Sequence, residues 1–202
     1  DDVFNVCKVE HATMMMLKEL GVRVANTAIV NSQQEDVLLV ERFDCADYRP
    51  THHFLSAHSL LNQAKITQQA LVESYSYGAM AEFIMKYGAE PRDAHELYAR
   101  MVFNILMGNT DDHPRNHAFL YSFSDQNWRL SPAYDVVTTS VYIEGEKEFA
   151  LNLNKGKNWY KVNFFHFEAF SWLHYKSIDF NWFQKKEEHF TMLLLSHYRI
   201  IL

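Results

Sequence analysis

Cysteine is nearly absent from this chain of 202 residues, which contains only Cys7 and Cys45. The two lie far apart and in no CxxC or metal-ligand spacing, which favours free thiols in a reducing compartment over a disulfide framework. The chain also lacks any uninterrupted apolar run of the ~18–20 residues that a membrane-spanning helix needs. Its first ten residues, DDVFNVCKVE, are acidic, the reverse of a secretory signal peptide. The sequence therefore predicts a cytoplasmic protein without a membrane segment.

Positive charge is also scarce, because 19 lysines and arginines stand against 25 aspartates and glutamates, for a net charge of −6. We therefore expect no direct nucleic-acid binding through a general electrostatic attraction. Apolar sequence is abundant instead: 48% of the residues are hydrophobic and 15% are aromatic, enough for one substantial core. No internal repeat or low-complexity segment interrupts it. These properties predict one globular domain, with room for two lobes.

The first 48 residues indicate a small mixed α/β portion. Residues 5–20 carry apolar side chains at the helical period and are followed by Gly21, a residue type that commonly ends helices. Residues 22–30 and 37–43 alternate as strands do around a polar turn, which predicts a hairpin. The polar segment 44–53 indicates a connection out of this portion.

Residues 49–202 indicate a larger, mainly helical portion. Helices are expected over 71–87 and 93–108, and two apolar runs at 117–123 and 128–137 predict a second hairpin around the turn-like SDQN. Residues 138–154 are strand-like, and the aromatic-rich remainder is expected to form two more helices. The predicted fold class is α+β, with the polar clusters between the two portions.

The densest polar cluster is GNTDDHPRNHAFL at 108–120, directly before the second hairpin. In it Asp111 precedes Asn116 by five positions, and Asp135 follows the hairpin. Two carboxylates and an amide supply the oxygen ligands that Mg²⁺ prefers beside phosphate oxygens and water. Phosphoryl transfer needs such metal ions, a base that orients the incoming hydroxyl and a cation near the transferred group. We predict Asp111 as the base and Arg115 as a phosphate contact. Asn116 and Asp135 would hold the metal.

Two other interpretations of this cluster stay open. An Asn-Thr-Asp-Asp run after glycine is also typical of a solvated turn, and the D-x-x-x-x-N spacing is short enough to arise by chance. Asp111, Asp112 and His113 could instead belong to a two-metal phosphohydrolase, in which carboxylates and histidines share cations. That role needs further His and Asp motifs upstream on helices, where only His11 and His95 are available and neither has a recognisable partner.

Three ordered segments, covering residues 9–137, resemble the HipA-type serine/threonine kinases, the toxins of bacterial toxin–antitoxin modules. GNTDDHPRNHAFL followed by WRLSPAYDVV resembles the family's catalytic and metal-binding motifs. VLLVERFDC resembles the segment that joins the two kinase lobes, and VEHATMMMLKELGVRVANTAIV resembles the helix and strand before it. The resemblance implies a protein-kinase-like fold, with residues 1–48 as an incomplete N-lobe with the inter-lobe segment and 49–202 as the C-lobe.

The resemblance also implies an enzyme that uses ATP and Mg²⁺. Asp111 would accept the proton of a serine or threonine hydroxyl, while Asn116 and Asp135 would coordinate Mg²⁺ between the ATP phosphates. The residues implied to contact ATP are Glu10, Glu41, Arg42, Phe43, His113, Arg115, Asn116, Tyr134 and Asp135.

Within this set, Glu41 and Phe43 would border the adenine, chiefly through main-chain groups. Glu10 is the candidate for the helix glutamate that pairs with the ATP-binding lysine, although Val9 stands where the family has asparagine. That lysine and the phosphate-covering loop would lie upstream of the helix, and this chain starts too late to include them. We therefore expect a longer natural kinase, and weak or no activity in the 202-residue chain.

The partners implied by the resemblance are a protein substrate and an antitoxin of the HipB type. In the family, substrates include aminoacyl-tRNA synthetases, whose phosphorylation halts translation. An alternative from another functional class is a kinase-derived binding module that acts with an antitoxin or with a separate lobe-bearing subunit. The aromatic series at 158–175 is interpreted mainly as core, and secondarily as a docking face for such a partner.

Overall fold

The computed structural model of the chain describes residues 5–62, 75–138 and 150–151. The expected C-terminal helices, the aromatic series and most of the strand-like segment 138–154 lie outside these residues. The elements follow in the order α1 (Val6–Glu19), β1 (Thr27–Ser32), β2 (Glu35–Val40), β3 (Cys45–Ala46), β4 (Arg49–Pro50), β5 (His52–Ser56), α2 (Ala57–Leu61), α4 (Tyr77–Tyr87), α5 (Arg92–Met107), the 3-10 helix η1 (Pro114–Asn116), β6 (Ala118–Ser122) and β7 (Asn127–Leu130). This mixture confirms the predicted α+β class.

The predicted N-terminal helix and hairpin are both present. α1 begins after Asn5, whose side chain accepts a hydrogen bond from the main-chain nitrogen of Lys8 at 3.0 Å. It ends before Gly21, which has a left-handed φ of 81°. β1 and β2 pair antiparallel, and Gln33 and Gln34 turn the chain between them with φ of 51° and 71°.

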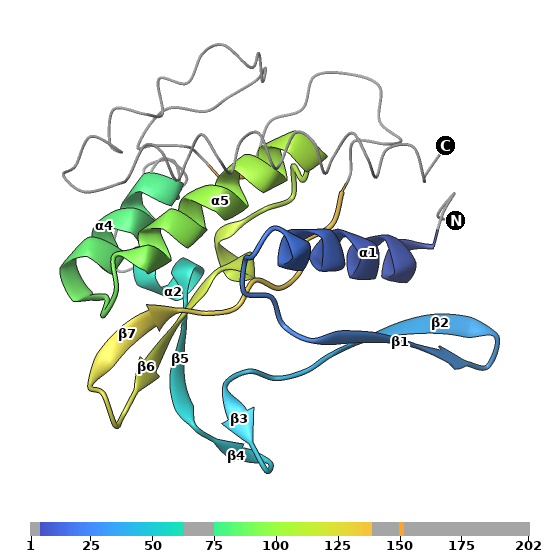
Figure 1. Cartoon of the computed structure of the whole chain (residues 1–202), viewed down its shortest axis with the longest axis horizontal. Coiled ribbons are helices and arrows are strands. Elements are labelled where there is room, and N and C mark those ends of the chain that lie inside the picture. Colours follow the sequence, from blue (N-terminus) through green and yellow to red (C-terminus); the bar gives the residue numbers. More distant parts are fainter. Residues whose placement is uncertain (1–4, 63–74, 139–149, 152–202) are drawn as a thin grey trace.

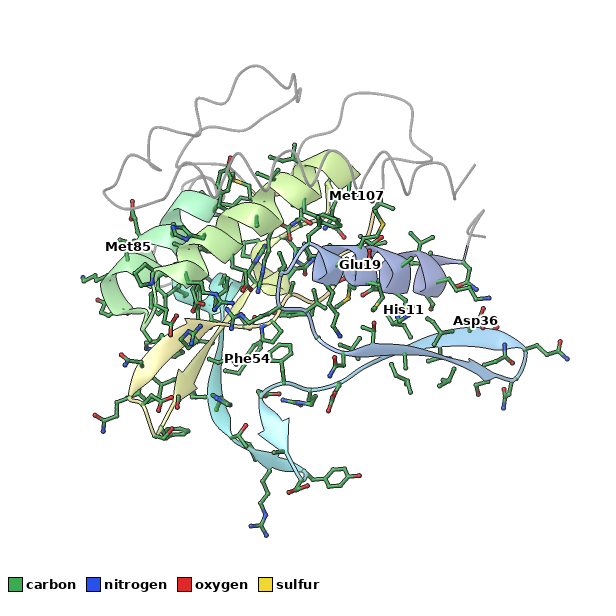
Figure 2. All side chains as sticks on the ribbon, in the orientation of Figure 1. His11, Glu19, Asp36, Phe54, Met85 and Met107 are labelled. Carbon is green, nitrogen blue, oxygen red and sulfur yellow. The ribbon has the colours of Figure 1, made fainter. Side chains whose placement is uncertain are left out.

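α1 lies along this hairpin. The ammonium group of Lys8 lies 2.7 Å from Asp36 on β2, and the ring of His11 contacts the hydroxyl of Thr27 on β1 at 2.7 Å. Figure 2 shows His11 and Asp36 on the facing sides of the helix and the hairpin. The opposite face of α1 buries Met14 and Leu17 in a core that it shares with α5.

The segment predicted as a connection at 44–53 differs in the structure. It forms the short β3–β4 hairpin and then enters β5, which pairs antiparallel with β6. The side chains of β5 are all exposed or half-buried. Its sequence, HHFLS, therefore does not alternate between apolar and polar residues, which is the pattern that identifies a strand. The boundary expected between residues 48 and 49 falls inside the β3–β4 hairpin and stays a prediction.

The larger portion consists of helices packed on a three-stranded sheet of order β5-β6-β7 (Figure 1). α4 and α5 lie together against this sheet, and their fully buried Met80, Leu97 and Met101 pack with Phe119 and Leu130 of the strands. The helix expected over 71–87 is confirmed for 77–87, and the one expected over 93–108 is confirmed. The predicted second hairpin is confirmed as β6 and β7.

A second core joins the two portions. It contains Met14 and Leu17 of α1, Phe103 and Met107 of α5, and Ala133; Met107 lies on the side of α5 that faces α1 (Figure 2). The chain that leaves α1 also pairs with the segment after β7. The main-chain nitrogen of Ala25 donates to the oxygen of Ala133 at 2.8 Å, and the nitrogen of Ala133 donates to the oxygen of Arg23 at 2.8 Å.

This pairing explains why the strand predicted over 22–30 starts only at Thr27. Val22 and Val24 alternate as a strand does, but they lie next to Ala133 and the second core instead of the hairpin. The same contact fixes the chain two residues before Asp135. None of the helices among the described residues is both long and apolar enough to cross a lipid bilayer.

Candidate active site

The polar cluster predicted at 108–120 is a loop that α5 delivers. The helix ends at Gly108, whose φ of 62° lies in the left-handed region that glycine adopts without strain. The nitrogen of Asn109 then bonds back to the oxygen of Asn104 at 2.8 Å. The next two side chains differ sharply, since Asp111 is exposed and Asp112 is only 3% exposed. Of the two neighbouring carboxylates, only Asp111 can reach a substrate in solution.

Asn116 connects this loop to the segment of Asp135. Its side chain is buried, and its amide nitrogen lies 3.4 Å from the main-chain oxygen of Asp111 and 3.3 Å from that of Asp135. If the side-chain amide were flipped, its oxygen would face the carbonyl oxygens of Asp111 and Asp135 and be repelled by them. Because the amide protons face these carbonyls, the side-chain oxygen is the atom left to bind a cation.

Asp135 itself adopts a left-handed conformation with φ of 56°. Asp tolerates this region better than most residues, and such conformations concentrate at functional sites. Although the residue as a whole is exposed, neighbouring protein shields its carboxyl from bulk water and thereby raises its pKa. The charges of Asp111 and Asp112 raise this pKa further, while the ring of His113 opposes them.

Glu10 reaches the same region from α1. Partial burial raises the pKa of its carboxyl, and the negative charge of Asp135 adds to the effect. Like charges gathered in this way repel one another until a cation lies between them. The predicted helix glutamate and the predicted metal ligand are therefore electrostatic neighbours.

The segment expected to border adenine runs from Glu41 to Phe43. The main-chain nitrogen of Glu41 donates to Asn26 at 2.8 Å, so the carbonyl of Glu41 is the main-chain group left for a ligand. The guanidinium of Arg42 makes two hydrogen bonds to Asp44, at 2.9 and 2.5 Å. The side chain of Arg42 is thus bonded to the residue that directly follows this segment.

Tyr134 connects this segment to the loop at 108–120. Its ring lies 5.5 Å from the ring of Phe43, centroid to centroid, and its hydroxyl donates to the main-chain oxygen of Arg115 at 2.8 Å. Phe43 also lies 6.3 Å from Phe54 on β5. The residues predicted for the two ends of a nucleotide are therefore joined through one tyrosine.

Positive charge lies on the side of the loop that faces α2. Arg115 is exposed and His113 is half-buried. Burial lowers the pKa of His58 on α2, and the nearby charges of Arg115 and His113 lower it further. His113 and Arg115, the two predicted nucleotide contacts, are thus close enough to His58 for their charges to change its pKa.

The sequence analysis missed a buried polar group beneath the loop. Asp112 accepts hydrogen bonds from Tyr77 and His117, and Tyr77 in turn accepts one from Asn104 at 3.2 Å. The paired aspartates in DDH were the visible signal. The sequence does not show which of them faces inward, since that depends on helices distant in the chain.

The donor set fits magnesium. Mg²⁺ is commonly held by one or two protein oxygen ligands together with phosphate oxygens and water, which an amide and a carboxylate can provide. Among the described residues, no group of three or more His, Cys, Asp or Glu side chains is arranged to hold a metal.

Comparison with known proteins gives a consistent result. The family model of the HipA-like C-terminal domain matches residues 1–198. A protein of Haemophilus influenzae named as a candidate kinase is 31% identical over 146 residues, which are 67% of this chain and 42% of that protein. The serine/threonine-protein kinase toxin HipA of Shewanella oneidensis is 24% identical over 162 residues, 72% of this chain and 37% of the toxin. The chain thus spans less than half the length of these curated relatives.

Solved structures agree with this. The Shewanella oneidensis HipA, determined with HipB and operator DNA, superposes with a TM-score of 0.62 at 25% identity, over 75% of this chain and 39% of that one. The Helicobacter pylori proinflammatory kinase CtkA gives a TM-score of 0.60 at 16% identity, over 77% of this chain and 63% of that one. The predicted protein-kinase-like fold is thereby confirmed.

Proposed function

This chain belongs to the family of HipA-like C-terminal domains, and from that premise we propose that it carries the catalytic and metal-binding part of an ATP- and Mg²⁺-dependent protein serine/threonine kinase. The observation that carries the proposal is the double hydrogen bond of Asn116. One side chain holds the loop of Asp111 to the segment of Asp135, at 3.4 and 3.3 Å. The proposed base and the proposed metal ligands therefore belong to segments that are bonded to each other, although a hairpin separates Asn116 from Asp135 in sequence.

Each residue has a role that its surroundings allow. Asn116 and Asp135 would bind Mg²⁺, which neutralises the charge of the ATP phosphates when bound. Asp111, exposed at the surface of the loop, orients the acceptor hydroxyl and accepts its proton. The oxygen of the serine or threonine then bonds to the γ-phosphorus, and the bond to the bridging oxygen of ADP breaks. His113 and Arg115 would supply positive charge near the phosphates.

The base of the nucleotide would lie at the other end of Tyr134. The carbonyl of Glu41 and the main chain of Phe43 would bond the adenine edges, and the ring of Phe43 would border the purine. Arg42 would act through its main chain, because its side chain is bonded to Asp44. Glu10 would help to orient the phosphate end.

We further propose that the whole protein acts as the toxin of a toxin–antitoxin pair. The name of the Shewanella relative gives it as a toxin, and its solved structure contains HipB and operator DNA. A HipB-type antitoxin is therefore the expected partner. An aminoacyl-tRNA synthetase is the expected class of protein substrate, which rests on the family resemblance alone.

Calorimetry on the 202-residue chain tests the proposal at its first step. We expect ATP to bind at least about tenfold more tightly with Mg²⁺ than without it, and we expect Asp135→Asn to abolish that gain. Transfer of labelled γ-phosphate to protein serine or threonine, measured on a longer form of the protein, tests the second step, with Asp111→Asn as the inactive control. Partner binding without any nucleotide affinity would contradict the kinase and support the binding-module alternative.

A further inference from the structure

We propose that Asp112 is a positioning residue, which fixes the loop so that Asp111 faces the acceptor hydroxyl and Asn116 faces the metal. This inference rests on the proposed function, but it concerns a side chain to which that function gives no role. Asp112 neighbours the candidate base in sequence, yet it points in the opposite direction, into the protein.

The buried carboxylate is held from two elements. The hydroxyl of Tyr77, at the start of α4, donates to one carboxylate oxygen. Nε2 of His117, directly before β6, lies 3.0 Å from both carboxylate oxygens. The rings of Tyr77 and His117 also pack edge to face, with centroids 5.6 Å apart. Asp112 therefore ties the loop to a helix and to a strand at once.

The contacts continue back to the beginning of the loop. Asn104 on α5 donates to the hydroxyl of Tyr77 at 3.2 Å, and the amide nitrogen of Asn109 donates to the side-chain oxygen of Asn104 at 3.2 Å. Anchors at positions 109, 112 and 117 thus flank both functional positions, 111 and 116. A loop fixed at three points has little freedom to turn either side chain away.

Energetics favour a functional reason for this arrangement. Removing a carboxylate from water carries a penalty of several kcal/mol, and well-packed apolar residues often replace buried charges without loss of stability. Asp112, Tyr77 and Asn104 are all nearly inaccessible to solvent. Since a purely structural core would not need such a group, its place beside Asp111 indicates that it determines the conformation of the loop.

Its contacts distinguish Asp112 from a second base. A general base must come within hydrogen-bond reach of the substrate proton. Both oxygens of Asp112 already face Tyr77 or His117 inside the protein. Asp112 therefore acts through Asp111 and Asn116.

Four proteins test the proposal: the wild-type chain, Asp112→Ala, Asp112→Asn and the control Met80→Ala. Met80 is fully buried on α4, the helix of Tyr77, and packs in the core with Leu97, Met101, Phe119 and Leu130, but it has no polar group that could bond to the loop. The two measurements are amide hydrogen exchange across residues 109–117 and the gain in ATP affinity on adding Mg²⁺. A lower melting temperature alone does not change the gain in affinity of a folded protein, and Met80→Ala shows how much exchange rises from a general loss of stability.

We expect Asp112→Ala to raise exchange in 109–117 and to reduce the magnesium-dependent gain by about 10- to 100-fold, with metal-free ATP affinity unchanged. Asp112→Asn should partly restore both the protection of residues 109–117 from exchange and the magnesium-dependent gain, because an amide retains one acceptor oxygen. Met80→Ala should lower the melting temperature without reducing the magnesium-dependent gain. If Asp112→Ala behaves like Met80→Ala, or leaves exchange in the loop unchanged, the proposal is wrong. A wild-type chain without a magnesium-dependent gain would instead refute the kinase, and the exchange data would still judge the role of Asp112.

Discussion

The side-chain amide of Asn116 lies 3.3 Å from the main-chain oxygen of Asp135, a residue 19 positions further along the chain. The bond spans the whole β6–β7 hairpin and holds the two candidate metal ligands together through the protein alone. Two consequences follow for Asn116: its amide nitrogen sets the position of its neighbours, and its oxygen is left for the cation.

Replacing Asn116 by Asp tests this double role. The substitution keeps the size and one oxygen but removes both donors and adds a negative charge beside Asp135. We expect the magnesium-dependent gain in ATP affinity to fall by about 10- to 100-fold. Calorimetry with and without Mg²⁺ measures it, with Asn31→Asp on the distant hairpin as the control. An undiminished gain would mean that the amide protons have no organising role.

Replacing Glu10 by Gln should stabilise the metal-free chain at neutral pH. The pKa of Glu10 is raised above 4.5, first by burial and then by the charge of Asp135. The folded state therefore holds the proton more tightly than the unfolded state, so the contribution of Glu10 to stability is greatest at low pH and is lost as the pH rises through the raised pKa.

The melting temperatures of the two proteins should accordingly coincide near pH 4 and separate towards pH 7, with Glu10→Gln the higher. Thermal denaturation in a chelating buffer measures this difference. Glu35→Gln, on the exposed hairpin, serves as the matched control. A lower melting temperature for Glu10→Gln at pH 7 would show that Glu10 is paired favourably instead of repelled.

Asp93 on α5 holds together the segments that precede Asp135 in space. Its carboxylate accepts hydrogen bonds from Arg23 at 2.8 Å, from Arg129 at 2.9 Å and from the main-chain nitrogen of Leu130 at 2.7 Å. Because these contacts join α5 to the chain before β1 and to the end of β7, they support the pairing that precedes Asp135. We expect Asp93→Asn to destabilise the fold by about 2 kcal/mol at pH 7, because the half-buried Arg23 and Arg129 lose the buried carboxylate that pairs with them.

The loss of stability caused by Asp93→Asn should become smaller as the pH falls. Burial alone would raise the pKa of Asp93, but Arg129, the amide of Leu130 and Arg23 together bring it below 3.8. A depressed pKa stabilises the fold above the unfolded value and loses this contribution as the pH falls through the folded value. Urea unfolding between pH 7 and pH 3 should therefore show the gap between wild type and Asp93→Asn narrowing below about pH 3.8. A gap of constant size would contradict the ionic origin.

Phe43 and Asp135 should affect nucleotide binding differently. Phe43→Ala removes a ring beside Tyr134, and aromatic contacts of this kind are worth about 1 kcal/mol, or roughly fivefold in affinity. We expect it to weaken ATP to the same extent with and without Mg²⁺, because it acts on the adenine end. A loss confined to the magnesium complex would place Phe43 at the phosphate end.

The parts predicted correctly from the sequence are those that local chemistry determines. The period of the apolar residues identified α1, α4 and α5, and Gly108 marked the beginning of the loop. β5 was missed because its sequence has no apolar alternation, and its extended conformation depends on hydrogen bonds to β6, which is distant in the chain. The opposite orientations of Asp111 and Asp112 were also beyond local reasoning, because Tyr77 and His117 decide them from other elements. The resemblance to the HipA-type kinases is confirmed by the family match.

A crystal structure of the chain with Mn²⁺ and a non-hydrolysable ATP analogue tests the central claim most directly, because the anomalous signal of manganese locates the cation itself. We expect a manganese peak about 2.1 Å from both the side-chain oxygen of Asn116 and a carboxylate oxygen of Asp135, beside the terminal phosphates. A peak bound by other side chains, or an analogue bound away from these two residues, would contradict it.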